Sequence, residues 1–253
     1  MKKQMRPMNK GRGSLTGRAV YLVERRWPLA LLILWTAPTS AVPTPAASAY
    51  PAMAPAAQYM MNPAAEIALA RSAAPASVSG KAEILVLGAH GYETAVKGTN
   101  GFVCYVGRSW ENDIDDANFW NPRQRAPECD NAVSARSVLP YYLQRTRWVL
   151  SGVTRAEMLK RTRAEIASGQ ITAPAIGAMC FMLSREGYLA SARGPWHPHV
   201  MFYGPPGPGS AWGADLPGSP VLSYRSDLMP VTIYFVLVRK WSDGKLAKYG
   251  PRQ

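Results

Sequence analysis

Three histidines are the residues best suited to chemistry in this chain. His197 and His199 stand two residues apart, so both imidazoles project from one face of an extended segment. The third, His90, follows an apolar run that we expect to be a strand. Three converging imidazoles could hold a divalent metal such as zinc and leave positions open for substrate, with Glu93 and Asp215 as further ligands. A metal-dependent enzyme is one hypothesis. We favour the other, in which His199 packs in a sheet, His197 lies in a loop and no cofactor is bound.

Nucleophilic catalysis has less support in the sequence. The chain lacks the Gly-x-Ser-x-Gly pattern that presents a serine on a sharp strand-to-helix turn. Cys104 and Cys180 lie inside apolar, strand-like runs, where a thiol is usually buried and unreactive. No catalytic residue can therefore be assigned from the sequence.

Four acidic residues stand close together in a stretch without regular periodicity: Glu111, Asp113, Asp115 and Asp116. Their spacing is similar to that of a calcium-binding loop, but the glycine turn and the final bidentate glutamate of such a loop are missing. We interpret the stretch as a solvated acidic loop; the alternative is a loosely bound cation.

Six large aromatic residues stand in or beside segments that we expect to be loops: Trp110, Phe119, Trp120, Trp148, Trp196 and Trp212. They could line one groove and stack on a ligand. The interpretation we favour is that they cover the ends of a sheet.

The first 49 residues have the organisation of a secretory signal peptide. A basic stretch over residues 1–26 is followed by eleven apolar residues, 27–37, and then by small residues with Ala-x-Ala-like sites. Eleven helical residues cover only about half of the ~30 Å hydrocarbon core, so we expect no permanent transmembrane anchor. We therefore predict an exported protein, periplasmic or extracellular, with a flexible Ala/Pro-rich leader at 50–61 and one globular domain at 62–253.

The charge of the chain is divided between these parts. The formal net charge is +13, but residues 1–49 carry eight basic residues and one acidic residue, which leaves +6 for the remainder. A domain of this size with +6 is only moderately basic, and nucleic-acid binding requires basic residues clustered on one face. We expect no specific nucleic-acid binding, and the sequence indicates no other partner.

Local patterns predict three helices and six strands. The sequence Asn62-Pro63 predicts a helix start and Pro75 a stop, because Asn caps helices and Pro favours the first helical position. Thr154 and Glu157 form a capping box ahead of another helix, in which Glu157 can pair with Arg161. Short apolar runs predict buried strands. The further helix is expected at 140–150, the capped one runs to about 168, and the strands are at 82–87, 92–96, 102–106, 178–184, 199–203 and 231–238.

The order of these elements predicts the fold class. Asn100-Gly101 is a strong hairpin signal, so the first three strands are expected to form a meander. Strands, then helices, then strands indicate an α+β fold with a mainly antiparallel sheet and long Gly/Pro-rich loops. We expect the helices of 140–168 on one face, and residues 231–238 at a central position because their apolar run suits burial on both faces.

Three sequence segments carry a resemblance. The run 97–104 (KGTNGFVC), the run 127–130 (PECD) and His199-Val200-Met201 resemble a family of uncharacterised exported bacterial proteins. The similarity extends over about residues 66–241. It implies a secreted single domain without a known activity. The expected function is that of a non-catalytic envelope or ligand-binding protein.

The three cysteines allow only one disulfide within the chain. Export places the protein where disulfides persist. We predict a Cys104–Cys129 disulfide that ties the acidic stretch to the sheet, because Cys180 lies in an apolar run typical of a buried free thiol. Two of the three segments that carry the resemblance end at or next to the same two cysteines. The competing pair is Cys104–Cys180, which would leave Cys129 exposed.

Overall fold

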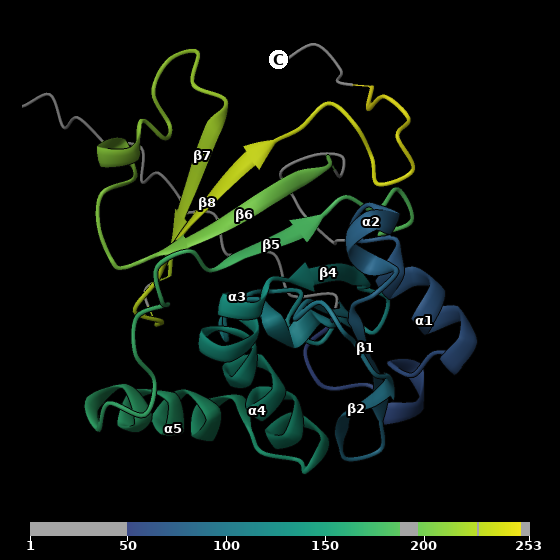
Figure 1. Ribbon diagram of the computed structural model, residues 1–253. Helices are drawn as coiled ribbons and strands as arrows, with labels where there is room; N and C mark the ends of the chain where they lie inside the picture. Colours follow the sequence, from purple (N-terminus) through teal and green to yellow (C-terminus); the bar gives the residue numbers. More distant parts are fainter. Residues whose placement is uncertain (1–49, 188–196, 227, 249–253) are drawn as a thin grey trace, which may run out of the picture. The chain divides into compact units, whose positions relative to one another are not determined.

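Eight strands form one sheet in the order β2-β1-β3-β4-β5-β6-β8-β7, shown in Figure 1. The computed structural model describes residues 50–187, 197–226 and 228–248, all within one compact unit that spans Ala46–Gln253. Every neighbouring pair is antiparallel except β1 and β3, which are parallel. The protein is therefore α+β with a mostly antiparallel sheet, as the sequence predicted. The strands are β1 (Glu83–Gly88), β2 (Gly91–Val96), β3 (Val103–Gly107), β4 (Ala126–Asp130), β5 (Met179–Met182), β6 (His199–Gly204), β7 (Val221–Arg225) and β8 (Thr232–Leu237).

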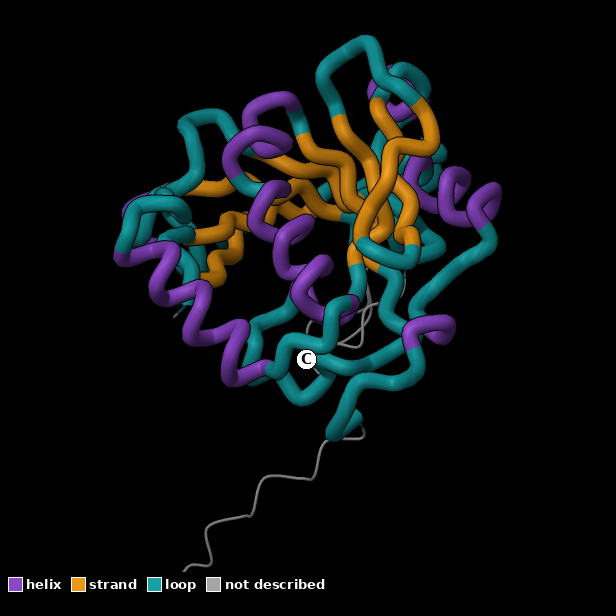
Figure 2. The backbone as a smooth tube through the Cα atoms, turned by 90° about the horizontal axis from the view of Figure 1, so that it is seen from below, coloured by secondary structure: helices purple, strands orange, loops and turns teal. Residues whose placement is uncertain are grey.

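The helices flank the strands, as the tube in Figure 2 shows. Two of them begin where the sequence predicted: the Asn62 side chain accepts hydrogen bonds from two backbone amides of α1, and Thr154 Oγ1 accepts one from Glu157 in α5. Arg161 pairs with Glu157 at 3.1 Å, also as predicted. The helices are α1 (Pro63–Arg71), α2 (Ala76–Ser79), α3 (Ala132–Ser137), α4 (Leu139–Leu150) and α5 (Arg155–Ala167), with 3-10 turns η1 (Ala56–Gln58), η2 (Ser109–Glu111) and η3 (Gly209–Trp212).

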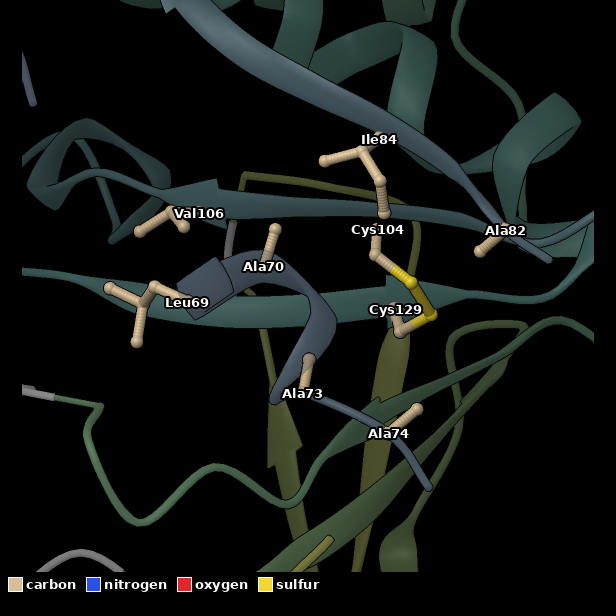
Figure 3. Packing of buried hydrophobic residues seen from close by; sticks show 9 residues of the cluster. All are labelled: Leu69, Ala70, Ala73, Ala74, Ala82, Ile84, Cys104, Val106 and Cys129. Carbon is tan, nitrogen blue, oxygen red and sulfur yellow. A yellow bond between two sulfur atoms is a disulfide. The ribbon is translucent and has the colours of Figure 1, made fainter. Parts of the chain in front are cut away.

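One face of the sheet is covered by α1. Leu69 and Ala70 of this helix pack against Ile84, Cys104 and Cys129, as shown in Figure 3. Because side chains alternate along a strand, the neighbours of these residues point to the other face.

The other face carries α3 and α4. Leu139 of α4 packs with Leu85 and Tyr105, and Val133 and Val138 contact a cluster of side chains from β5 and β6. Helices therefore lie on both faces of the sheet, since α1 occupies the side opposite to α4.

The Cys104–Cys129 disulfide is present, and Cys180 is a buried free cysteine, as predicted. Cys129 does not lie in an irregular stretch, however. It belongs to β4 and pairs directly with Cys104 in β3, so the bridge joins two neighbouring strands. Cys180 is opposite Asp130, and its side chain therefore points to the other face of the sheet, away from both bridged cysteines.

The predicted meander is wrong. The hairpin joins β1 and β2 through the turn at Ala89-His90, and β3 then lies on the far side of β1, parallel to it. Asn100 does not form a hairpin turn. Its amide donates to the Val78 carbonyl and its Oδ1 accepts from Phe102 N, which fixes the crossover between β2 and β3.

Two strands, β4 and β7, were not predicted. β4 contains Pro127, which argues against a central strand because it cannot donate to a ladder. The ladder between β4 and β5 covers only Cys129 and Asp130, so Pro127 has no β5 partner to satisfy. The predicted strand 231–238 lies between β6 and β7 as β8, next to the edge, and most of it is only half-buried.

Residues 50–61 are not a free leader. Tyr59 is completely buried, and its hydroxyl donates to the Trp120 carbonyl at 2.8 Å. Tyr50, Met53 and Met60 pack against the same apolar cluster. Aromatic and methionine side chains supply enough apolar surface to dock a segment that is otherwise Ala/Pro-rich.

The predicted signal peptide, residues 1–49, and Trp196 lie outside the described residues. Among the helices that the structure describes, none is long and apolar enough to cross a membrane. The disulfide is compatible with export, because disulfides persist outside the cytosol.

Candidate functional site

Three carboxyl side chains are buried together between the sheet and the helices α3 and α4. Glu128 and Asp130 are two residues apart in β4, so both project from the same face of the sheet, and Glu111 reaches them from η2. Tyr105 donates to Glu128 Oε2 at 3.3 Å, and Ser134 donates to Asp130 Oδ1 at 2.6 Å. This group, called here the carboxyl cluster, consists of Glu111, Glu128 and Asp130.

Gly107 makes the closest approach in the cluster possible. A Cβ at this position would collide with Glu111 Oε2 and lie 3.1 Å from Glu128 Oε1. The Glu111 and Glu128 side chains are hydrogen-bonded to each other. Two carboxyl groups can bond in this way only if at least one of them holds a proton. The pair, called here the carboxyl dyad, therefore holds at least one proton.

Burial favours the protonated form of each carboxyl group in the cluster. Loss of solvent raises the pKa of Glu111 to about 8, against the hydrogen bond from the dyad and the charge of Arg108, which lower it. Burial and the neighbouring charge of Glu111 raise the pKa of Glu128 well above its usual range. Burial also raises the pKa of Asp130 to about 7, although the bond from Ser134 lowers it. Such shifts are found both at functional sites and in structural networks.

The arginines near the cluster are bound elsewhere. Arg108 forms a buried ion pair with Glu66 at 2.8 Å and also donates to the carbonyls of Tyr59 and Val106. Arg145 donates to the carbonyls of Trp110 and Asn112. The described residues thus give the three carboxyl groups no ion pair, so no ion pair offsets the effect of burial on their pKa values.

A pocket of about 240 Å³ opens beside the cluster, and we call it the tyrosine pocket. Three tyrosines line it: Tyr141 and Tyr142 from α4 and Tyr203 from β6. The Tyr141 hydroxyl is buried without a hydrogen-bond partner among the described residues. The remaining lining residues are Arg136, Ser137, Val138, Pro140, Gln144, Gln170, Ile171, Thr172, Pro174, Met229, Pro230 and Val231.

Two of these tyrosines connect the pocket to the carboxyl cluster. Burial raises the pKa of Tyr142, and the charges of Glu128, Glu111 and Asp130 raise it further. Burial likewise raises the pKa of Tyr203, with contributions from Cys180, Asp130 and Glu128. Both hydroxyls are therefore neutral at physiological pH and can each donate a hydrogen bond.

A second pocket, of about 340 Å³, lies along α5 from Arg155 to Arg163, and we call it the charged pocket. Arg155 and Arg163 line it from α5, and Asp113 and Asp115 line it from the acidic stretch. Ile114, Ala156, Leu159 and Leu228 complete the lining. Two arginines and two aspartates thus share one pocket with aliphatic side chains.

The structure does not bring the three histidines together. His90 lies in the β1–β2 turn and is exposed, whereas His199 is buried in β6. Four strand spacings of about 4.8 Å separate β1 from β6, or roughly 19 Å. His199 Nδ1 is 2.9 Å from the His197 carbonyl oxygen, and burial lowers the pKa of His199. Within the described ranges, no group of three His, Cys, Asp or Glu side chains could hold a metal ion.

The additional ligands considered for that site are also dispersed. Glu93 is exposed in β2, at the opposite end of the sheet order from β7. Asp215, with φ of 60°, accepts hydrogen bonds from the backbone and hydroxyl of Ser223 and holds the loop before β7.

Sequence reasoning treated Glu111 as part of a solvated acidic loop, which is wrong for this residue. Part of Glu111 reaches the surface, but its Oε1 is completely buried. Glu128, Asp130 and the tyrosines were missed altogether. The available signal was the alternation in Glu128-Cys129-Asp130, which places two acids on one face of any strand.

The aromatic residues mostly form core rather than a groove. Trp110, Phe119 and Trp120 are buried in one cluster, and Trp148 packs against it. Trp212 is different: it is 64% exposed and stacks on Tyr234 at 4.9 Å between ring centroids.

Comparison with known proteins found no match: no family model, no curated protein and no solved structure matches this chain.

Proposed function

We propose that this protein is exported to the periplasm or beyond, and binds a small, uncharged ligand in the tyrosine pocket without transforming it. The observation that carries the proposal is the buried Tyr141 hydroxyl, which lines the pocket and has no partner in the described chain. A buried polar group left unpaired costs about 1–3 kcal/mol, and a bound ligand that hydrogen-bonds to it removes that cost.

The lining of the pocket indicates the class of ligand. Tyrosine hydroxyls and the amides of Gln144 and Gln170 donate and accept hydrogen bonds, while Val138 and Met229 offer apolar surface. A volume of about 240 Å³ is below the 300–1,000 Å³ of pockets for drug-sized ligands, so the ligand is small. It would be a compact ring compound with hydroxyl or amino groups.

The carboxyl cluster explains why an anion is disfavoured. Any ionised fraction of Glu128 or Asp130 places negative charge behind Tyr142 and Tyr203. Tyrosines that face such charge donate outward to a neutral acceptor more readily than they host a carboxylate or phosphate.

Thermal-shift screening of the protein purified after export tests the proposal, with neutral monosaccharides, nucleosides and phenols as probes. Hits are then titrated calorimetrically against Tyr141→Phe and Tyr203→Phe. Each variant removes one hydroxyl, and a lost hydrogen bond of ~1 kcal/mol weakens binding about fivefold. Tyr234→Phe is the matched control, because Tyr234 is a buried tyrosine on the other face of the sheet.

The proposal is contradicted if no probe raises the melting temperature, or if both pocket variants bind as tightly as the unchanged protein. Turnover of a probe by the purified protein would contradict the non-catalytic part alone.

A further inference from the structure

We infer that the charged pocket is a second binding site, which takes a zwitterion of amino-acid or dipeptide size with an aliphatic side chain. This inference is independent of the tyrosine pocket, since the two pockets share no lining residue.

The charges of the charged pocket point to a ligand with both signs. Arg155 and Arg163 project from α5 and Asp113 and Asp115 from the acidic stretch, so the four formal charges cancel. A simple cation would meet the two arginines, and a simple anion would meet the two aspartates. A ligand that carries a carboxylate and an ammonium group can pair with the arginines and with Asp115 at once.

Three of these charged side chains are not neutralised by the protein. In the described part of the chain, Arg155, Arg163 and Asp115 form no ion pair with another residue. Arg155 instead lies over the Phe119 ring, 5.0 Å from its centroid. Their charges remain available to a ligand, and the planar guanidinium of an arginine matches a carboxylate with two parallel hydrogen bonds.

The helix adds to the preference for a carboxylate beside Arg155. Ala156 lines the pocket in the first turn of α5, a helix of 13 residues. Backbone amides at a helix N-terminus carry a partial positive charge that favours an anionic group. The ligand's carboxylate is therefore placed near the start of α5, and its ammonium group near Asp115.

The apolar lining of the charged pocket favours an aliphatic side chain on the ligand. Ile114 is buried at 6% exposure, and Leu159 and Leu228 pack partly buried against the same apolar cluster. An aliphatic ligand side chain on these three residues removes apolar surface from water at about 25 cal/mol per Å². The pocket's 340 Å³ is near the lower end of the range for drug-sized ligands, which suits an amino acid or a dipeptide.

Isothermal titration calorimetry at low ionic strength tests the inference on the protein purified after export. The probes are leucine, the dipeptide Leu-Leu, N-acetyl-leucine and leucinamide. We expect saturable binding of leucine or Leu-Leu, and the tighter of the two identifies the size of the ligand. N-acetyl-leucine lacks the ammonium group and leucinamide lacks the carboxylate, so each should bind at least about fivefold more weakly.

Two surface variants locate the site. Asp115→Asn and Arg163→Gln should each weaken binding about fivefold, and both residues are exposed, so the fold tolerates the changes. Lys160→Gln is the matched control, because Lys160 lies on α5 outside the pocket.

Absence of saturable binding by leucine and Leu-Leu overturns the inference. Equal binding of the blocked probes, or unchanged affinity in both variants, also overturns it. Loss of leucine binding in Tyr203→Phe but not in Asp115→Asn would assign leucine to the tyrosine pocket, which overturns this inference and contradicts the uncharged ligand of the proposed function.

Discussion

Replacing Glu111 by glutamine should make the stability of the protein less dependent on pH. Burial raises the pKa of Glu111 to about 8 in the folded protein, whereas an unfolded glutamate titrates near its ordinary pKa of 4.5. Between these values the folded state holds a proton that the unfolded state has released. The stabilisation is therefore fully present below about pH 4.5 and is lost as the pH rises toward 8.

The size of the effect follows from proton linkage. One proton bound only by the folded state changes the free energy of unfolding by about 1.4 kcal/mol per pH unit. Burial also raises the pKa of Asp130, to about 7, and that of Glu128 above its usual range, so these two residues hold further protons in this pH range. We expect the native protein to lose up to ~4 kcal/mol per pH unit from pH 5 to 7, and about two thirds of that slope should remain in Glu111→Gln.

Glutamine is the informative substitution because its amide imitates a protonated carboxyl and can donate to Glu128. Urea unfolding followed by tryptophan fluorescence at pH 5, 6, 7 and 8 gives the slope for each variant. Glu186→Gln is the control, since Glu186 is exposed and should leave the slope unchanged. A stability that rises from pH 5 to 8, or identical slopes for the native protein and Glu111→Gln, would refute the reasoning.

Four further changes test the packing by urea unfolding. Glu66→Ala should cost about 3–5 kcal/mol because it leaves a buried arginine unpaired, and a loss below 1 kcal/mol would contradict this role. Gly107→Ala should cost about 1–3 kcal/mol because the methyl group collides with the carboxyl dyad; unchanged stability would mean that the dyad moves freely. Removing the disulfide with Cys104→Ala and Cys129→Ala should cost about 3–4 kcal/mol for a sequence separation of 25, and the reduced native protein should match the double variant. Tyr59→Ala should cost about 3–5 kcal/mol and expose the chain before α1 to proteolysis, whereas resistance equal to that of the native protein would show that the segment docks without it.

Local signals predicted the elements that depend on neighbours in the sequence. The caps at Asn62 and Thr154 form within three residues of the side chain that makes them, so their free energy is local. The apolar runs that form β1, β3, β5, β6 and β8 were recognised because apolar residues tend to be buried whatever the topology of the chain.

Pairing between distant segments could not be predicted in the same way. The Asn100-Gly101 signal favoured a hairpin, but the crossover places β3 beside β1, where the hydrogen bonds of the Asn100 amide hold the connection. β4 was missed because Pro127 and two acidic residues are untypical of a buried strand, and the sequence does not show the neighbouring strands and helices that accommodate them.

The same distinction between local and long-range information applies to the candidate site. The sequence by itself determined which residues can titrate, which cysteines could pair and where helices begin, because these depend on residue type and close neighbours. Only the tertiary structure decided that His90 lies far from His199, that Glu111 is buried against Glu128, and that tyrosines separate the carboxyl cluster from a pocket. The physical reason is that a pKa and a binding site depend on desolvation and on charges within a few ångströms, and those neighbours come from segments far apart in the chain.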